Sequence, residues 1–166
     1  MNELKERLDQ LLGHVTMYKL VVIGLLAIAA VASMLMVSGY LPYSPLLFAV
    51  SLLLSVGTAY ASNRLLGWLF GVRPQADSAL ITGLIVALLF SPPVSVLAAV
   101  KIVLVVTIAM ASKYIVVVRG AHVFNPTAIA IVIASVSGLA YASWWIATPA
   151  LLPITAVVAC LMLYKT

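Results

Sequence analysis

The stretch "LVVIGLLAIAAVASMLMVSG", residues 20–39, contains no charged side chain. A helix needs about 20 apolar residues to cross the hydrocarbon core of a bilayer, so this stretch predicts a membrane-spanning helix. The whole chain has the same character, because 65% of its 166 residues are hydrophobic, only 8% are charged, and the mean hydropathy is +1.24. A soluble domain carries about 25% charged residues. The composition therefore predicts an integral membrane protein of the all-α class.

Further apolar segments follow this first span. Ala79–Phe90 is only 12 residues long and ends at the Pro pair of "SPP", so it predicts a half-membrane helix. We expect about six transmembrane or half-membrane helices in a single domain at residues 20–166, preceded by an amphipathic cytoplasmic lead at residues 1–19. The segments expected after the first are Pro45–Ser62, Ala79–Phe90, Val94–Ala111, Pro126–Tyr141 and Ala150–Tyr164.

The basic residues predict the orientation of these helices. Nine Lys and Arg against four Asp and Glu give a net charge of +5, and the positive residues lie at the ends of apolar segments, which argues against a nucleic-acid-binding patch. Lys101 alone lies within a span, where it either snorkels outward or has a function. If the segments cross the membrane in alternating directions, all the other basic residues lie on one side of it. The positive-inside rule then predicts a multi-pass protein of the cell membrane with both termini cytoplasmic. The residues on that side are Lys5, Arg7, Lys19, Arg64, Arg73, Lys113, Arg119 and Lys165.

Two of the expected short helices start with the same kinds of residue. Asp77 and Ser78 precede "ALITGLIVALLF", and Asn125 with Pro126 precedes "TAIAIVIASVSG". Asp, Ser and Asn are preferred N-caps, and Pro is favoured at the first helical position. A helix N-terminus presents free N–H groups and about half a positive charge, so two converging N-termini favour an anionic or electron-rich ligand. Ordinary capping at the membrane surface is the alternative.

These two motifs carry a resemblance to a known family. "DSALITGLIVALLFSPP", residues 77–93, resembles the third-helix signature of the membrane flavoprotein family found in the sodium-translocating NADH:quinone oxidoreductase and in the Rnf complex. "HVFNPTAIA", residues 122–130, is similar to the motif that opens the fifth helix of that family. "ASKYIVVVRGAHVFNP", residues 111–126, together with "SWW" resembles a variant subfamily whose membrane half precedes a cytoplasmic ferredoxin-reductase-type domain. We expect that soluble domain to lie outside this chain.

Members of that family hold flavins in the membrane and pass electrons between soluble redox partners. Some carry FMN covalently on a threonine in a pattern resembling Asp-x-x-Ser/Thr-Gly-Ala-Thr. Here "ASWWIATP", residues 142–149, keeps Ala147 and Thr148 but has Ala142 at the Asp position and Trp145-Ile146 at the Ser/Thr-Gly position. The resemblance therefore implies a non-covalent flavin, either riboflavin or FMN. It also implies an oxidoreductase module that receives electrons from a cytoplasmic reductase domain binding FAD and NAD(P)H.

The resemblance places the expected flavin site at the two helix starts. Asn125 matches the Asn that lies beside the membrane flavin in the family, although it also suits an N-cap. His122 either hydrogen-bonds a flavin carbonyl or lies in the interfacial layer. For Asp77, the roles open are a helix cap, a bond to a ribityl hydroxyl or to the flavin N3–H, and a pair with Arg73.

The remaining candidate residues also have two interpretations. Ser78 and Thr82 are one helical turn apart and face the same way, so their hydroxyls either contact the flavin or serve backbone bonding and helix packing. Lys113 and Tyr114 end a span, where they form an interfacial anchor or contact a phosphate or the flavin. Trp144 fits an aromatic belt or flanks the flavin ring.

Other functions compete with flavin-dependent electron transfer. A small-molecule transporter or vitamin-binding subunit would hold its substrate between the same helix ends. A haem reductase needs paired axial ligands, commonly His, and the chain has only His14, which precedes the first span, and His122. A lone Cys160 supports neither a disulfide framework nor a thiolate metal site. A homodimer would imitate the ten-helix family member.

Overall fold

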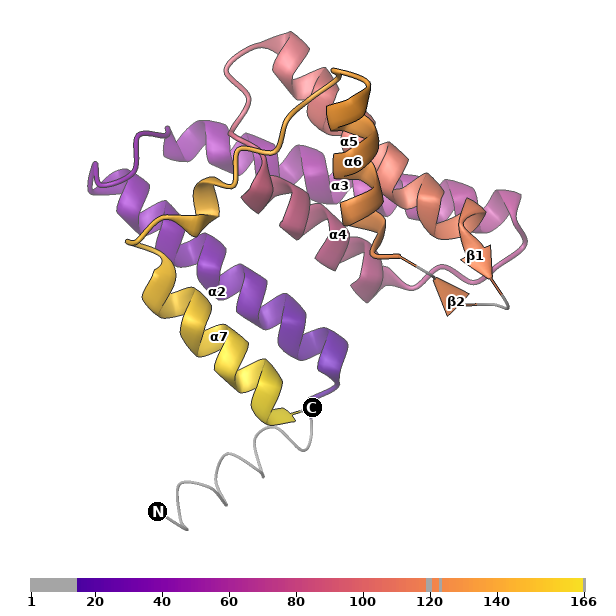
Figure 1. Cartoon of the computed structure of the whole chain (residues 1–166), viewed down its shortest axis with the longest axis horizontal. Helices are drawn as coiled ribbons and strands as arrows, with labels where there is room; N and C mark the ends of the chain where they lie inside the picture. Colours follow the sequence, from indigo (N-terminus) through magenta and orange to yellow (C-terminus); the bar gives the residue numbers. More distant parts are fainter. Residues whose placement is uncertain (1–14, 119–120, 123, 166) are drawn as a thin grey trace.

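The computed structural model describes residues 15–118, 121–122 and 124–165 (Figure 1). This part of the chain forms six α-helices, one 3-10 turn and a β-hairpin whose two strands have two residues each. The prediction of a helical protein with about six helices is therefore confirmed for the described part. Of the lead expected at residues 1–19, residues 1–14 lie outside the described part. The elements are α2 (Met17–Val37), α3 (Pro45–Leu69), α4 (Ala76–Leu89), α5 (Val96–Ile115), β1 (Val117–Val118), β2 (Ala121–His122), α6 (Pro126–Val136), η1 (Trp145–Ala147) and α7 (Leu152–Lys165).

Three of these helices, α2, α3 and α5, are long and apolar enough to cross a membrane, whereas α4, α6 and α7 are shorter. The outward faces of the long helices are apolar as well, and large side chains such as Met34, Leu53 and Leu97 are exposed on them. Contiguous apolar surface of this kind is typical of contact with lipid or with another protein. These features suggest a membrane protein.

Helix α3 is longer than the sequence predicts. It continues past the expected end at Ser62 to Leu69, through a segment that has the composition of a polar connection. The physical reason is that a buried face of mostly small or polar residues recurs every four positions and continues beyond Ser62. This face packs against α4 and α5. Its members are Ser51, Ser55, Ala59, Asn63 and Gly67.

Small residues allow α3 and α4 to approach closely. A Cβ added at Gly83 of α4 would lie 2.7 Å from the Cα of Val56 and 2.9 Å from the carbonyl oxygen of Ser55. Close approach of this kind is common in helix packing in membranes, where small residues let backbones come together and van der Waals contact holds the helices. The position of α4 is therefore set by its contact with the α3 backbone.

The starts and ends of the short helices also differ from the predicted ones. Helix α4 begins at Ala76 with Gln75 as its N-cap, so Asp77 and Ser78 lie within the first turn and do not cap it. Helix α6 begins as predicted, with Asn125 as N-cap and Pro126 first. It ends at Val136, short of the expected Tyr141, because Gly138 adopts φ +68° and turns the chain.

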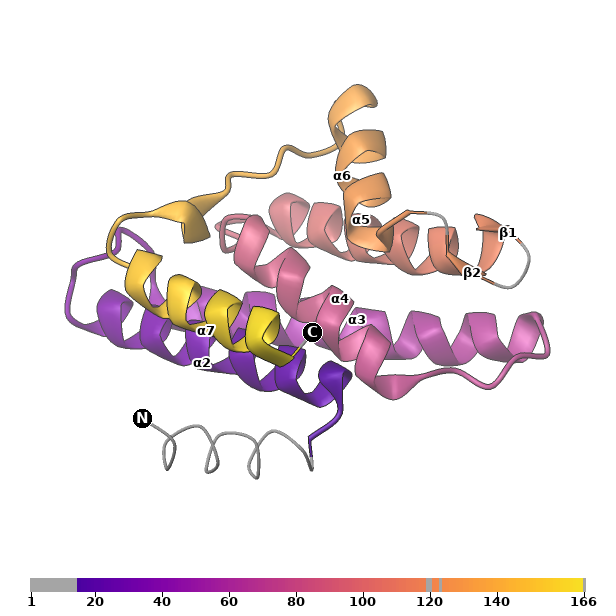
Figure 2. The same cartoon turned by 60° about the horizontal axis from the view of Figure 1, so that its bottom comes forward.

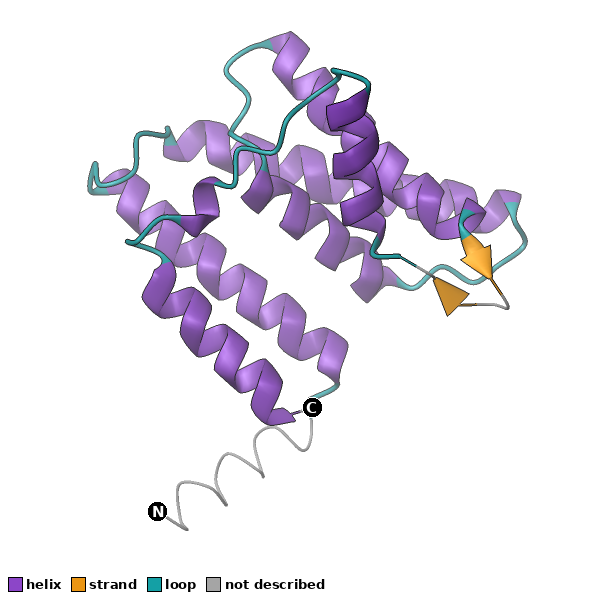
Figure 3. Ribbon diagram, viewed as in Figure 1, coloured by secondary structure: helices purple, strands orange, loops and turns teal. Residues whose placement is uncertain are grey.

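The helices are arranged in two groups around α4. Helices α2 and α7 lie side by side and antiparallel, with the Nζ of Lys165 donating to the carbonyl of Val15 (Figures 1 and 2). Helices α3, α4, α5 and α6 enclose the larger core, and Figure 2 shows α6 rising away from the layer that contains α3 and α5. Figure 3 shows the β1–β2 hairpin beyond the end of α5, where Val117 pairs with His122.

Helices α2, α3, α4, α5 and α7 run to and fro along one direction. In Figure 2, α2 and α4 start toward the right and α3, α5 and α7 end toward the right, whereas α6 runs away from this layer. The basic residues at these helix ends and in the loop before α4 therefore share one end of the fold. Those in the described part are Lys19, Arg64, Arg73, Lys113 and Lys165.

Candidate functional site

Three neighbouring cavities surround the start of α4. The Lys113 cavity measures about 500 Å³, the Asn125 cavity about 350 Å³ and the Asp77 cavity about 270 Å³. Gln75 lines both the Lys113 and the Asp77 cavities, and Tyr18 lines both the Asp77 and the Asn125 cavities. Because each shares a wall residue with the next, the three form a series around one helix end. Volumes of about 300–1,000 Å³ are usual for small-molecule sites.

The Asn125 cavity lies where the two predicted helix starts meet. Ser78 and Thr82 of α4 line it together with Asn125, Pro126 and Thr127 at the start of α6. The two starts that the sequence predicts to converge thus share one cavity. Phe124, Tyr18 and two isoleucines of α4 supply the apolar remainder of the lining.

The hydrogen bonds of the Asn125 cavity leave one hydroxyl without a partner. The Oδ1 of Asn125 accepts from the backbone N–H of Thr127 at 2.9 Å, which makes Asn125 an N-cap. Thr82 donates its hydroxyl to the carbonyl of Ser78 at 2.9 Å, as expected for a helical threonine. The Oγ1 of Thr127 is buried and has no hydrogen-bond partner among the described residues. Buried polar groups are normally hydrogen-bonded, so this hydroxyl lacks the partner that such groups usually have.

The start of α4 is not capped by a side chain. Gln75 makes no side-chain hydrogen bond to the first turn, and the predicted capping by Asp77 does not occur because Asp77 is itself in that turn. Asp77 lines its own small cavity beside Tyr18. Within the described ranges, no ion pair joins Asp77 to Arg73. An acidic residue in the first turn is nevertheless favourable, since it faces the positive end of the helix dipole.

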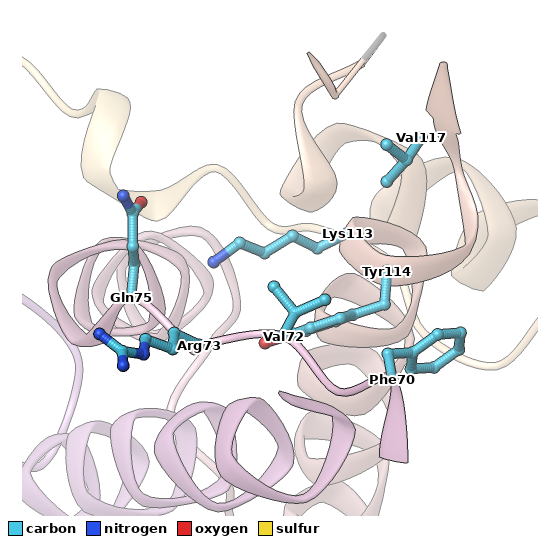
Figure 4. A pocket seen from close by; sticks show the side chains of 7 residues that line it. All are labelled: Phe70, Val72, Arg73, Gln75, Lys113, Tyr114 and Val117. Carbon is cyan, nitrogen blue, oxygen red and sulfur yellow. The ribbon is translucent and has the colours of Figure 1, made fainter. Parts of the chain in front are cut away.

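The Lys113 cavity is lined by a buried lysine. Lys113 is only 8% exposed, and its Nζ has no hydrogen-bond or ion-pair partner in the described part of the chain. Figure 4 shows the side chain extending across the cavity, with its amine on the side of Gln75 and Arg73. The predicted interfacial-anchor role does not fit this burial, because an anchoring lysine extends its amine into water.

A buried network forms the wall between α3, α4 and α5. The hydroxyl of Tyr114 donates to the Oδ1 of Asn63 at 2.7 Å, and the Nδ2 of Asn63 donates to the carbonyl of Gln75 at 3.0 Å. The ring of Phe70 stacks on Tyr114 with a centroid separation of 5.7 Å. Asn63 thereby joins the ends of three helices at the Lys113 cavity. Sequence reasoning missed it, although Asn63 continues the four-residue spacing from Ser55 to Ala59, which was a usable signal.

Trp144 does not lie at this site. It is exposed, precedes η1, and donates its backbone N–H to the carbonyl of Leu89 at the opposite end of α4. Thr148 follows η1 and is likewise remote from the start of α4. His122 lies in β2, but the placement of its side chain is outside the described part.

The described residues contain no group of three or more His, Cys, Asp or Glu side chains that could hold a metal ion. The arrangement instead combines hydrogen-bond donors, a buried cation and aromatic surface at one helix end. We found no match for the chain among family models, curated proteins or solved structures.

Proposed function

We propose that this chain is a membrane electron-transfer module that binds a non-covalent flavin, riboflavin or FMN, at the start of α4. The observation that carries the proposal is that the starts of α4 and α6 share one cavity whose buried Thr127 hydroxyl lacks a partner among the described residues. The resemblance of residues 77–93 and 122–130 to membrane flavoproteins supports the same ligand.

The residues present fit a flavin. A bound flavin supplies the electron transfer itself, and the protein supplies position and electrostatics. The Thr127 hydroxyl and the amide of Asn125 offer hydrogen bonds to ring oxygens and nitrogens, while the isoleucines of α4 and Phe124 offer an apolar surface. The free N–H groups at the start of α4 favour negative charge nearby, which stabilises electrons held on a ligand there.

The proposed electron donor is a cytoplasmic reductase domain that binds FAD and NAD(P)H. The alternation of the helices supports this orientation, because the three cavities lie at the end of the fold that carries Lys19, Arg64 and Arg73. By the positive-inside rule this end is cytoplasmic, and both ends of the described chain lie on it. A reductase on that side would reach the site without crossing the bilayer. A homodimer of this chain would imitate the ten-helix family member.

An absorption spectrum of the purified protein tests the proposal. We expect a yellow protein with the two bands of an oxidised flavin, and we expect acid to release the flavin intact because no covalent bond holds it. Thr127→Val should weaken flavin affinity about tenfold and so lower flavin occupancy, because one hydrogen bond of about 1.4 kcal/mol is lost. Thr107→Val is the matched control, because Thr107 is exposed on α5 and bonds only its own helix at Val103.

Other outcomes would replace the proposal. Colourless protein that copurifies with a different small molecule would favour the transporter or vitamin-binding subunit, and a Soret band would favour haem. Equal flavin occupancy in the Thr127 and Thr107 variants would show that the Asn125 cavity is not the flavin site.

A further inference from the structure

Lys113 is a buried cation without a counter-ion in the described structure. Its amine is enclosed in the Lys113 cavity, although it belongs to the last turn of α5, close to an end of the fold where a lysine side chain usually reaches water. Burying an unpaired charge is costly, so such a group is normally matched by an opposite charge. The carbonyl end of the α5 dipole favours the positive charge, but none of the described carbonyls accepts a hydrogen bond from the amine.

The groups around this amine favour an anion. Arg73 brings a second positive charge, and the amide of Gln75 adds a neutral polar group. Among the described residues that line the cavity, none is acidic. The nearest acid along the wall is Asp77, which lines the adjoining cavity and forms no ion pair with Lys113. Both Lys113 and Arg73 line this cavity, and two basic residues at one site suit an anionic group.

The size and lining of the cavity indicate that the anion is part of a larger molecule. A volume of about 500 Å³ exceeds the space that one small ion needs. The side opposite the polar groups is formed by the stacked rings of Phe70 and Tyr114 with Val72 and Val117. A ligand with a charged group at one end and an apolar or aromatic body at the other matches both walls.

We propose that the Lys113 cavity binds the phosphate group of an amphiphilic ligand, with Lys113 and Arg73 as its cationic partners. A flavin phosphate ester and an anionic phospholipid share this chemistry. The inference does not require a flavin ring in the Asn125 cavity. If the flavin proposal is also correct, the series of cavities around α4 would favour FMN over riboflavin.

Binding to the full chain in phosphatidylcholine nanodiscs tests both sources of phosphate. One arm titrates FMN and riboflavin separately and follows the quenching of flavin fluorescence. The other arm compares the unfolding temperature in discs with and without phosphatidylglycerol. The variants are Lys113→Met and Arg73→Gln, and the control is Lys101→Met, which removes a lysine from the same helix that does not line the cavity.

We expect the wild type to prefer FMN over riboflavin in the first arm, or discs with the anionic phosphatidylglycerol over discs of zwitterionic phosphatidylcholine alone in the second. A charged hydrogen bond is worth about 10- to 100-fold in affinity, so FMN should bind more tightly than riboflavin by that factor, or phosphatidylglycerol should raise the unfolding temperature. Lys113→Met should abolish the preference, Arg73→Gln should weaken it, and Lys101→Met should preserve it. A preference in the FMN arm identifies a flavin phosphate, and one confined to the other arm identifies a lipid headgroup.

Two outcomes would overturn the inference. One is a wild type that shows no phosphate preference in either arm, and the other is a preference that persists in a folded Lys113→Met protein. Failure of the flavin proposal is separately recognisable. In that case neither flavin binds, while phosphatidylglycerol still stabilises the wild type more than the Lys113 variant.

Discussion

The two ends of α4 differ in how their polar groups are satisfied. At the last turn, the carbonyl of Leu89 accepts from the backbone N–H groups of Ser143 and Trp144 at 3.0 and 3.1 Å, and the indole of Trp145 donates to the carbonyl of Phe90 at 3.0 Å. At the first turn no side chain caps the helix, and three cavities surround it. The last turn is thus closed by contacts within the fold, whereas the first turn is where we propose that a ligand binds.

At the last turn of α4, Trp145 should contribute most to the stability of the fold. Its ring is buried against Tyr43 and Phe48, with centroids 5.5 and 5.3 Å away. Trp145→Ala should therefore lower the free energy of unfolding by about 3–5 kcal/mol, because it leaves a cavity and removes the bond to Phe90. Urea or thermal unfolding in detergent measures this. The exposed Trp144 is the matched control, and Trp144→Ala should change stability by about 0.5 kcal/mol or less. Equal losses would contradict the assignment.

Asn63 should contribute less than Trp145 to the free energy of unfolding. It should contribute more to ligand binding at the first turn of α4. Asn63→Ala removes the amide that donates to the Gln75 carbonyl and leaves the Tyr114 hydroxyl only the backbone carbonyl of residue 63, which should cost about 1–3 kcal/mol. The same variant should weaken ligand binding in the Lys113 cavity, because that wall loses its connection between helices. Arg64→Ala is the control: its guanidinium bonds the exposed Tyr60 hydroxyl, and the expected change is within about 0.5 kcal/mol. Unchanged ligand affinity in Asn63→Ala would show that the wall does not position the site.

Asn125 should have the smallest effect on stability. Asn125→Ala removes the cap of Thr127, at a cost of about 1 kcal/mol, whereas Asn125→Asp keeps a side-chain acceptor and should stay near the wild type. If Asn125 serves only as a cap, flavin occupancy should follow stability in these two variants. A larger loss of flavin in Asn125→Asp than in Asn125→Ala would instead indicate direct contact, because a carboxylate cannot donate the amide hydrogen bond and repels a reduced anionic ring. Spectra and unfolding curves on the same samples separate the two roles.

Local signals in the sequence predicted several features of the fold. The uncharged run at residues 20–39 corresponds to α2, which begins a little earlier, at Met17. Asn125 followed by Pro126 predicted the start of α6 correctly, because a cap and a first-turn proline act within one turn. The same reasoning was wrong for Asp77, since the helix begins one residue before it. A helix can start on either side of a polar pair, so these residue types alone do not fix its first residue.

Other features depend on contacts between distant residues. Asparagine is a residue type common in loops. Asn63 nevertheless lies inside α3, because Tyr114 and Gln75 satisfy its side-chain amide. Lys113 resembles a surface anchor in the sequence, and its burial follows from the loop after α3 and the start of α4, which cover it. Trp144 and Trp145 are chemically identical neighbours, yet one is exposed and the other is in the core.

The amino-acid sequence alone was sufficient for the helical class, the approximate number of helices and the convergence of two helix starts. The length of an apolar segment and the capping of a helix are local properties, so they do not depend on which other segments pack nearby. The tertiary structure was needed to find the buried lysine, the Asn63 network and the difference between the two ends of α4. These arise because burial and hydrogen bonding depend on which segments become neighbours. Two α-helices that pack together can lie at any separation along the sequence.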